Sequence, residues 1–530
     1  MRFSPAHSLP KISAAQPWRW PAQSRARLGV LAQAAALFTL FSALFALVQY
    51  ATPALADHDG YYHLRLAQLM RVAGFKPPFV WLPLSLLSPA SYYDHHFLHH
   101  VYLSLFAGSA DPAGLIQGGK LASVFMPALA FVAAWWLLRG QNVRGASLWA
   151  LGLFAMSEAF LYRLSMPRAQ AASLLILILG LHWLLQRRYA ALLPLGLIYV
   201  WWYNAFPLLL VIAGAYAAAA LLTERRLEWR AVAYPALGIA LGLIINPYFP
   251  QNLTFIAQHV LPKIGPAATA TAVGNEWYPY QTWTLVENSG PALAVFLLGA
   301  LALGWRGRRM DRPTLTAFFL AAGFGFMLFK SRRFVEYYPA FALLFAALSA
   351  APIVDEWLTT PRTWAWPRPL AGLARVAWAR LAPLACLLLL AAPLAGTLRQ
   401  ARAAMAASQP AELYAGASAW LTTHSAPGSL VFQTDWDDFP RLFFYNTQNL
   451  YTIGLDPTYM ELYDAQLYAE WVALTRGEVP QPSGPIHARF GAEFVLTDLK
   501  HAAFLKQAAA DPGLQEVYRD DHAAIFQVRP

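Results

Sequence analysis

Long apolar runs separated by short, arginine-rich loops fill the first 398 residues of this chain. A run of about 20 apolar residues can cross a lipid bilayer as a helix, because a helix pairs its backbone donors and acceptors internally. Only 13% of the 530 residues are charged, against about 25% in an ordinary soluble protein. We therefore predict an α-helical polytopic membrane protein with about eleven transmembrane helices.

The predicted spans are set by the apolar runs alone. They lie near residues 28–50, 119–138, 146–162, 171–186, a run ending at 203, 206–222, 231–246, 291–305, 313–329, 335–350 and 381–398. Several are shorter than the roughly 20 residues that a span needs, so we expect their true ends to differ by several residues. The single cysteine, Cys386, excludes a disulfide bond within the chain.

The arginines between the spans indicate which side of the membrane each loop occupies, because cytoplasmic loops are enriched in Lys and Arg. They concentrate in every second loop, so the formal net charge of +11 reflects topology and not a nucleic-acid partner. We expect residues 1–26 to form a cytoplasmic tail. The loops 51–112 and 247–289 then lie on the outer face, which we expect to be the periplasmic side of a bacterial inner membrane.

The last part of the chain has a different pattern. Apolar runs shorten to strand length at 429–433, 493–497 and 524–528, and a helical pattern covers 460–474. We therefore predict two domains. A transmembrane domain covers residues 1–398, and a C-terminal α/β soluble domain covers residues 399–530 on the periplasmic side.

The stretch from Asp57 to Arg65, with the sequence DHDGYYHLR, comes soon after the first span. Its carboxylates, Asp57 and Asp59, stand one residue apart. Such a pair can share a divalent cation or act as a base beside a bound substrate. The alternative is a polar, solvated end to a membrane helix, and these nine residues leave both interpretations open.

Two pairs of arginines depart from the charge pattern, because they fall on the predicted outer side. Arg163 and Arg168 follow the third span, and Arg332 and Arg333 precede the tenth. Cations at that level favour the binding of an anionic group such as a lipid phosphate or pyrophosphate. The alternative is snorkelling to ordinary lipid headgroups.

Two further stretches combine acidic and aromatic residues. Glu276 lies in the second outer loop beside Trp277 and Tyr278, a composition suited to a sugar or peptide platform, or simply to a membrane interface. In the C-terminal region, acidic residues surround Trp436 after a predicted strand. They can receive a ligand or cap the next helix.

Four histidines have the i, i+4 spacing of zinc ligands on a helix, at positions 95, 96, 99 and 100. No glutamate stands between them in the metalloprotease arrangement. We therefore expect them to bind substrate through hydrogen bonds or to pack at the interface, ahead of binding a metal.

These stretches, in this order and on one face, resemble the catalytic subunit of oligosaccharyltransferases and its wider class, the GT-C polyprenyl-phosphate-dependent glycosyltransferases. The matching pieces are Asp57 to Arg65, Phe160 to Met166, Glu276 to Pro279, Arg333 to Tyr337 and, more weakly, Trp436 to Pro440. Each motif is weak alone, and their order and sidedness carry the resemblance.

The resemblance implies roles for particular residues. Asp59 would bind a metal or act as the base, assisted by Asp57, and Glu276 would engage the metal and the acceptor. The residues implied to hold the carrier phosphate are Arg163, Arg168 and Arg333. The other substrate-binding residues implied by the matched motifs are His63, Arg65, Trp436 and Asp437.

The chain departs from the family at its metal site. The family's second aspartate pair falls near residues 168–172, where this chain has Arg168 followed by Ala and Gln. A divalent cation (Mg²⁺ or Mn²⁺) held by Asp59 and Glu276 therefore stands beside the alternative that Arg168 replaces the cation. The acceptor motif also differs at Asp438 and Phe439, so asparagine glycosylation does not carry over.

Together these expectations describe a membrane glycosyltransferase. It would move a sugar or oligosaccharide from a polyprenyl-phosphate or -pyrophosphate carrier to an acceptor on the outer face. Its partners would be that lipid-linked donor, membrane lipids and an acceptor that is a protein, a lipid or a glycan. The alternatives are a transporter or flippase of lipid-linked glycans and a non-catalytic homologue, which the missing aspartate pair suggests.

Overall fold

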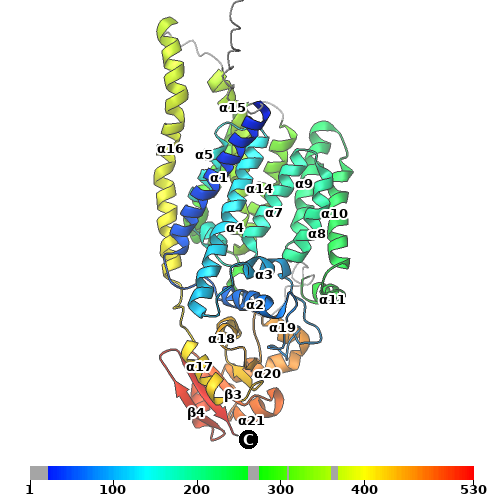
Figure 1. Ribbon diagram of the computed structural model, residues 1–530, viewed down its shortest axis with the longest axis vertical. Coiled ribbons are helices and arrows are strands. Elements are labelled where there is room, and N and C mark those ends of the chain that lie inside the picture. The colour runs from blue at the N-terminus through cyan, green and yellow to red at the C-terminus, as the bar shows by residue number, and fades with distance from the viewer. Residues whose placement is uncertain (1–21, 261–273, 307–309, 360–367, 530) are drawn as a thin grey trace, which may run out of the picture.

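The computed structural model describes residues 22–260, 274–306, 310–359 and 368–529. Most of the predicted cytoplasmic tail, residues 1–26, lies outside these residues, as does the middle of the predicted loop 247–289. A bundle of helices forms one end of the molecule, and a small α/β domain containing the C-terminus forms the other (Figure 1).

Seven helices among the described residues are long and apolar enough to cross a membrane. They are α1 (Ala22–Gln49), α4 (Pro112–Gly140), α9 (Pro207–Glu224), α13 (Thr282–Arg306), α14 (Arg312–Lys330), α15 (Tyr338–Thr359) and α16 (Arg368–Ala406). Shorter apolar helices accompany them: α5 (Ala146–Gly152), α7 (Gln170–Leu185), α8 (Leu192–Trp202) and α10 (Trp229–Ile244). These helices correspond to the predicted spans, so the chain is a polytopic integral membrane protein.

The predicted third span, 146–162, is not one continuous helix. After α5 and a 3₁₀ turn, α6 (Glu158–Leu164) begins at Ser157, whose Oγ accepts a hydrogen bond from the backbone N–H of Phe160 at 3.2 Å. A serine side chain favours such a start, because it satisfies one of the free N–H groups of the first turn. The break starts a separate helix, α6, with Arg163 in its last turn.

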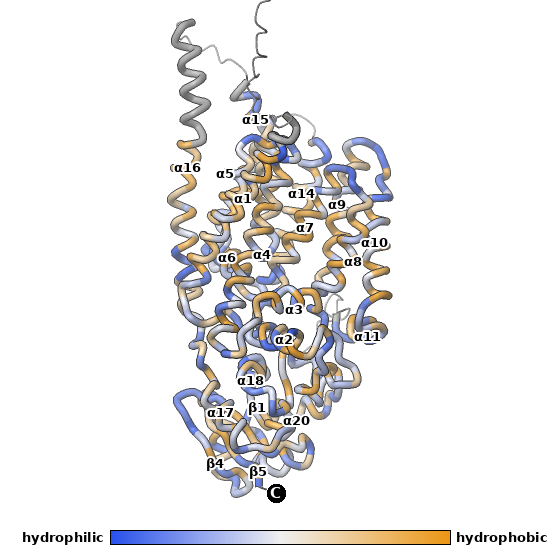
Figure 2. The backbone as a smooth tube through the Cα atoms, in the orientation of Figure 1, coloured by the Kyte–Doolittle hydropathy of each residue, from blue (hydrophilic) through white to orange (hydrophobic). Residues whose placement is uncertain are grey.

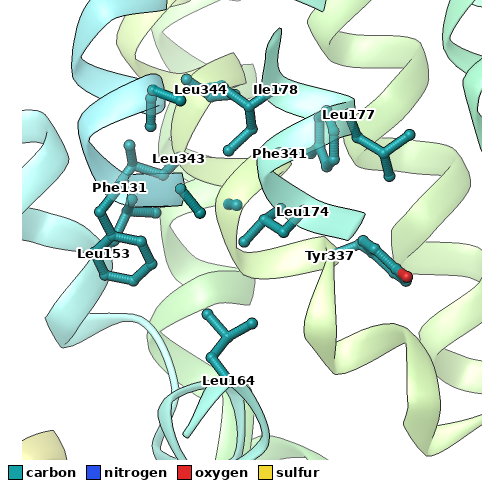
Figure 3. Close-up of a cluster of buried hydrophobic side chains, with 14 of the residues drawn as sticks. Phe131, Leu153, Leu164, Leu174, Leu177, Ile178, Tyr337, Phe341, Leu343 and Leu344 are labelled. Atoms are coloured by element: carbon teal, nitrogen blue, oxygen red, sulfur yellow. The ribbon is translucent and has the colours of Figure 1, made fainter. Parts of the chain in front are cut away.

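Side chains from helices far apart in the sequence interlock inside the bundle (Figure 3). Phe131 of α4, Leu174 and Leu177 of α7, and Phe341 and Leu344 of α15 are all fully buried. Hydrophobic residues are frequent along the bundle helices (Figure 2), and many large ones are exposed, among them Leu31, Leu222, Leu301 and Phe326. An apolar exterior over an apolar core is unfavourable in water and is what a lipid environment requires.

Two amphipathic helices, α2 (Asp59–Ala73) and α3 (Phe97–Ser104), lie between the bundle and the α/β domain (Figure 1). The first two turns of α2 contact both sides. Tyr61 and Leu64 belong to a buried cluster that includes residues at the start of α4. Tyr62 and Leu66 belong to another cluster, which includes Phe439 of the α/β domain. Helix α2 therefore joins the α/β domain to the helix bundle through buried apolar contacts.

The α/β domain contains a mixed sheet in the order β2-β1-β3-β5-β4. Strand β1 (Leu430–Gln433) is parallel to β2 (Leu450–Tyr451) and β3 (Phe494–Asp498), whereas β5 (Ala523–Val528) is antiparallel to β3 and β4 (Leu514–Arg519). The helices are α17 (Ala415–His424), α18 (Phe439–Tyr445), α19 (Thr458–Tyr463), α20 (Ala465–Thr475), α21 (Ser483–Pro485) and α22 (Ala502–Ala510). This confirms the predicted C-terminal α/β fold.

The sequence patterns located some of these elements better than others. β1, β3 and β5 fall within a residue of the predicted strands, and β2 and β4 were not predicted. The helical pattern 460–474 is divided between α19 and α20, because Asp464 accepts hydrogen bonds from Gln466 and Leu467 and starts a second helix. The last long helix, α16, runs on to Ala406, a few residues beyond the proposed domain boundary at 398.

Candidate active site

Two segments that are distant in the sequence meet at the start of α2. A Cβ atom added to Gly60 would lie 2.3 Å from Cγ of Pro167, in the turn between α6 and α7. The proline cannot continue α6, because its nitrogen carries no hydrogen for the helical hydrogen bond. Glycine at position 60 lets this turn approach α2 closely and bring Arg168 to the carboxylates of Asp57 and Asp59.

The guanidinium of Arg168 binds both of these carboxylates. Its Nε and Nη2 donate to the two carboxylate oxygens of Asp57, the Nη2 contact measuring 2.6 Å. Nη2 also lies 2.8 Å from Oδ2 of Asp59, and Nη1 lies 3.5 Å from Oε2 of Glu276. The forked geometry of a guanidinium suits such shared binding. One cation therefore joins three carboxylates from two loops that are distant in the sequence.

Glu276 lies on the 3₁₀ turn η4 (Asn275–Trp277) and faces three arginines. Oε1 accepts a hydrogen bond from Arg333 at 2.9 Å, and Oε2 accepts one from Arg163 at 2.6 Å. The turn is held in place because Ser331 donates to the backbone carbonyl of Glu276 at 2.8 Å. The structure thus brings together six predicted site residues: Asp57, Asp59, Glu276, Arg163, Arg168 and Arg333.

Two members of this network were not predicted as site residues. Glu336, at the end of η5 (Arg332–Glu336), is fully buried and accepts a hydrogen bond from Nε of Arg163 at 2.5 Å. Tyr203, after α8, accepts one from Nη2 of Arg333. A signal for Glu336 was present in the sequence, because a lone acidic residue beside an apolar run is costly to bury without a cationic partner.

The surrounding charges act unequally on the carboxyl groups of Asp59 and Glu276. Burial, together with the negative charges of Asp57, Asp437 and Glu276, raises the pKa of Asp59 to about 7 against the opposing effect of Arg168. Burial would also raise the pKa of Glu276, but the guanidiniums of Arg333, Arg163 and Arg168 outweigh it and hold that pKa well below its usual range. Asp59 therefore exchanges a proton near neutral pH, while Glu276 stays ionised.

Asp437 brings the α/β domain to the same site. Burial and the charges of Asp435 and Asp57 raise its pKa to about 7. Its backbone N–H donates to Oδ1 of Asp435 at 3.0 Å, so Asp435 caps the short turn that holds Asp437. Trp436, between them, is half-buried and packs against the apolar core of the α/β domain. Within this predicted acceptor motif, Asp437 therefore interacts electrostatically with the carboxylates of Asp57, Asp59 and Glu276.

Replacing Asp437 with asparagine should move the acidic limb of the pH–rate profile to lower pH. When ionised, Asp437 carries a negative charge that disfavours ionisation of Asp59, so its removal lowers the pKa of Asp59 from about 7. The measurement is kcat/KM for sugar transfer between pH 5 and 9. Asp464→Asn, which retains the cap of α20, is the control and should leave the limb in place. An unchanged limb in the Asp437 variant would contradict this coupling.

Arg65, predicted to bind substrate, connects α2 to the α/β domain. Its Nε donates to the backbone carbonyl of Phe444 in α18 at 2.6 Å, and its guanidinium lies 5.1 Å from the centre of the Phe444 ring. It also donates to Gln68 one turn along α2. These contacts hold α18 against α2, and the predicted role of Arg65 in substrate binding stays a prediction.

His63, also predicted to bind substrate, begins a chain of buried hydrogen bonds. Its Nδ1 lies 2.7 Å from Nε2 of His100, whose Nδ1 lies 2.8 Å from Oδ2 of Asp94. Burial and the neighbouring His100 hold the pKa of His63 well below its usual value, so its ring is neutral. A tautomer in which His100 donates from Nδ1 to Asp94 and accepts at Nε2 would have His63 donate from Nδ1 and keep the lone pair on Nε2.

The histidine cluster also supports the arginine turn. Nε2 of His99 lies 3.2 Å from the backbone carbonyl of Pro167, next to Arg168. Burial lowers the pKa of His99 to about 3, so this ring is neutral and its N–H donates to the carbonyl. The histidines thus bond to each other, to Asp94 and to Pro167. Their hydrogen bonding to substrate stays a prediction.

Replacing Gly60 with alanine should destabilise the protein by about 1–3 kcal/mol, the usual cost of overpacking a close contact. The added methyl group would meet the ring of Pro167 and push Arg168 away from Asp57 and Asp59. The measurements are the thermal unfolding midpoint in detergent and the rate of sugar transfer. Gly214→Ala in α9, where nothing lies within 4 Å of the added carbon, is the matched control. Equal effects of the two substitutions would contradict the packing argument.

A divalent cation held by Asp59 and Glu276 does not fit the site as folded. Mg²⁺ needs near-octahedral oxygen ligands at about 2.0–2.1 Å. Here the oxygens of Asp57, Asp59 and Glu276 converge on the guanidinium of Arg168. Within the described ranges no group of three or more His, Cys, Asp or Glu side chains is arranged to hold a metal ion.

No protein-family model matches the chain, and no curated protein matches it in sequence. Solved structures do match its fold. The Archaeoglobus fulgidus oligosaccharyltransferase AglB, in complex with an inhibitory peptide and a dolichol-phosphate, is 14% identical with a TM-score of 0.63. That match covers 90% of this chain and 71% of the other. An apo form of the same enzyme gives a TM-score of 0.62.

Two further structures share the fold. ArnT from Cupriavidus metallidurans, bound to undecaprenyl phosphate, is 16% identical with a TM-score of 0.56, covering 96% of this chain and 98% of that one. The mycobacterial arabinofuranosyltransferase AftD is 16% identical with a TM-score of 0.51, covering 93% and 41% respectively. At these identities the likeness establishes the architecture, and this chain has the fold of the GT-C glycosyltransferases.

Proposed function

We propose that this protein is a membrane glycosyltransferase that moves a sugar or oligosaccharide from a polyprenyl-phosphate or -pyrophosphate carrier to an acceptor. One observation carries the proposal. At the end of a bundle of apolar helices, Asp59 combines a pKa near neutrality with partial exposure of its side chain, 26%, beside a set of arginines. A proton acceptor beside cations is what displacement of a phosphate by a hydroxyl or amine requires.

Asp59 is the base in this proposal. It would accept the proton of the acceptor group as that group forms a bond to the anomeric carbon of the donor sugar. The bond from that carbon to the carrier's phosphate oxygen breaks, and the lipid phosphate leaves with the electron pair. Attack opposite the leaving group inverts the configuration of the sugar. Asp57, bound through both oxygens to Arg168, assists by holding that guanidinium beside Asp59.

Arg163 and Arg333 are the proposed ligands of the carrier phosphate. Both are largely buried, with 12% and 22% of their side chains exposed, and both form an ion pair with Glu276. Arg333 is further oriented by Tyr203 and by the ring of Trp277, 4.8 Å from its guanidinium carbon. Fixed cations of this kind stabilise the charge that develops on a departing phosphate.

The matching structures support a lipid-linked donor, because AglB is in complex with a dolichol-phosphate and ArnT is bound to undecaprenyl phosphate. The acceptor of this chain is proposed more broadly, as a protein, a lipid or a glycan. The arginine-rich loops support an orientation with the N-terminus in the cytoplasm. In that orientation the active site and the α/β domain face the periplasm from a bacterial inner membrane.

A deletion strain tests the proposal directly. Mass spectrometry of its lipids and surface glycans should show a polyprenyl-linked sugar accumulating and one glycoconjugate missing. The wild-type gene should restore both, and Asp59→Asn should restore neither although the variant is present in the membrane. Unchanged lipids and glycans in the deletion strain would refute the proposal.

The same experiment separates the alternatives. A flippase needs no base, so Asp59→Asn would restore the missing glycoconjugate if the protein moved lipid-linked glycans across the membrane. A non-catalytic homologue would bind undecaprenyl phosphate in nanodiscs, in preference to undecaprenol, and release no sugar from a lipid-linked donor. Either result would contradict glycosyl transfer.

A further inference from the structure

Arg168 has more acidic partners than the other arginines of the site. All three nitrogens of its guanidinium face carboxylates: Nε and Nη2 face Asp57, Nη2 also faces Asp59, and Nη1 faces Glu276. Arg163 by comparison pairs with two glutamates, Glu276 and Glu336. The cation of Arg168 therefore lies where the acidic residues of the first loop and of η4 converge.

A divalent cation and this guanidinium would compete for the same oxygens. Carboxylates hold Mg²⁺ or Mn²⁺ through lone pairs directed at a common point. In this site those lone pairs already accept N–H groups of Arg168, and two positive centres at one point would repel each other. A metal ion could enter this cluster only if the guanidinium left it.

The fold holds the guanidinium in place, so it is not a surface side chain that swings in and out. Only 16% of the Arg168 side chain is exposed. Its backbone is fixed by the contact of Pro167 with α2 at Gly60 and by the hydrogen bond from His99 to the Pro167 carbonyl. A cation positioned before the substrate arrives stabilises developing negative charge without reorganisation.

We propose that Arg168 takes the place of a divalent cation, so that sugar transfer by this protein is independent of metal ions. Arg168 acts as a positioning residue: it holds Asp57, Asp59 and Glu276 in one cluster and supplies the positive charge between them. The inference rests on the proposed glycosyltransferase function. A separate consequence is that removal of the guanidinium leaves carboxylates able to bind a metal ion. That binding can be measured without sugar transfer.

The test uses the full chain in nanodiscs, with Mn²⁺ as the probe and calorimetry as the readout. The wild type should bind no Mn²⁺ at this cluster. EDTA should change its rate of sugar transfer less than about twofold, because the positive charge belongs to the side chain of Arg168 and cannot be chelated. Arg168→Ala should gain a Mn²⁺ site that is at least about tenfold tighter than any in the wild type, since three carboxylates lose their cation. Adding Asp57→Asn to that variant should weaken the new site.

Two controls make the result specific. Arg168→Lys keeps the charge and should gain no Mn²⁺ site, and Arg163→Ala leaves only two carboxylates together and should also gain none. If Arg168→Ala does not fold, Arg168→Gln removes the charge while filling the space, and it should gain the same site.

Two outcomes would overturn the inference. One is a wild-type enzyme that loses transfer in EDTA and regains it with Mn²⁺. The other is a charge-removing variant that unfolds at the wild-type temperature and still binds no Mn²⁺. Failure of the proposed function looks different, because a wild type with no transfer of sugar in any assay would still give the Mn²⁺ result in Arg168→Ala.

Discussion

Asp59→Asn is expected to lower kcat for sugar transfer by about 10²–10⁴-fold, the range that a positioned general base contributes. The amide fills the same volume and can still accept a hydrogen bond from Arg168, so the protein should fold and bind its donor. What it cannot do is accept a proton from the attacking group. The measurement is single-turnover release of sugar from a lipid-linked donor, together with the unfolding temperature of the variant.

Asp57→Asn is the matched control, because it removes the same charge two residues away. Both oxygens of Asp57 are bound by Arg168, and its exposed fraction, 10%, is smaller than the 26% of Asp59. We therefore expect Asp57→Asn to cost much less than Asp59→Asn. Equal losses in the two variants, or full activity of Asp59→Asn, would refute Asp59 as the base.

Arg333→Ala is expected to give the second-largest loss, about 10²–10³-fold in kcat/KM for the lipid-linked donor, as removal of a fixed donor to a developing oxyanion does elsewhere. Arg333 is the proposed phosphate ligand that is held on separate sides by Glu276, Tyr203 and Trp277. Weakened binding of undecaprenyl phosphate, measured in nanodiscs, should accompany the loss of rate.

The neighbouring arginine provides the control for this variant. Arg332 donates to the backbone carbonyl of Pro279 at 3.2 Å and lies over the ring of Tyr280, at the edge of the site. Arg332→Ala should leave donor affinity within about threefold of the wild type, as for an exposed polar contact. If the two substitutions weaken donor binding equally, Arg333 does not have the role proposed here.

Much of the candidate site could be anticipated because its residues break local rules. Arg163 and Arg333 are cations on the predicted outer side of the membrane, where arginine is sparse. Asp57 and Asp59 are acids at the end of a predicted span. Such departures are visible in a linear sequence, since a charge near a membrane is costly wherever the chain places it. Their structural proximity is shown here, and their catalytic roles remain predictions.

Other features could not be anticipated because they depend on pairs that are distant in the sequence. His63 and His100 form a hydrogen-bonded chain with Asp94 only because α2 and α3 pack side by side. Arg65 lies six residues from Asp59 but binds the carbonyl of Phe444, on the other side of α2. The direction of a side chain on a short helix follows from what packs around it, which a motif does not encode.

The sequence by itself determined the membrane fold, the strands β1, β3 and β5, and most of the residues that meet at the site, because apolar length, alternation and misplaced charge are local properties. Only the tertiary structure decided where the guanidinium of Arg168 lies. From the sequence, Arg168 was either a cation for a lipid phosphate or a replacement for a divalent cation. In the folded protein the contact of Pro167 with Gly60 sets its guanidinium among three carboxylates. Coulomb energy depends on separation in space, and that separation is fixed by packing between segments more than 100 residues apart.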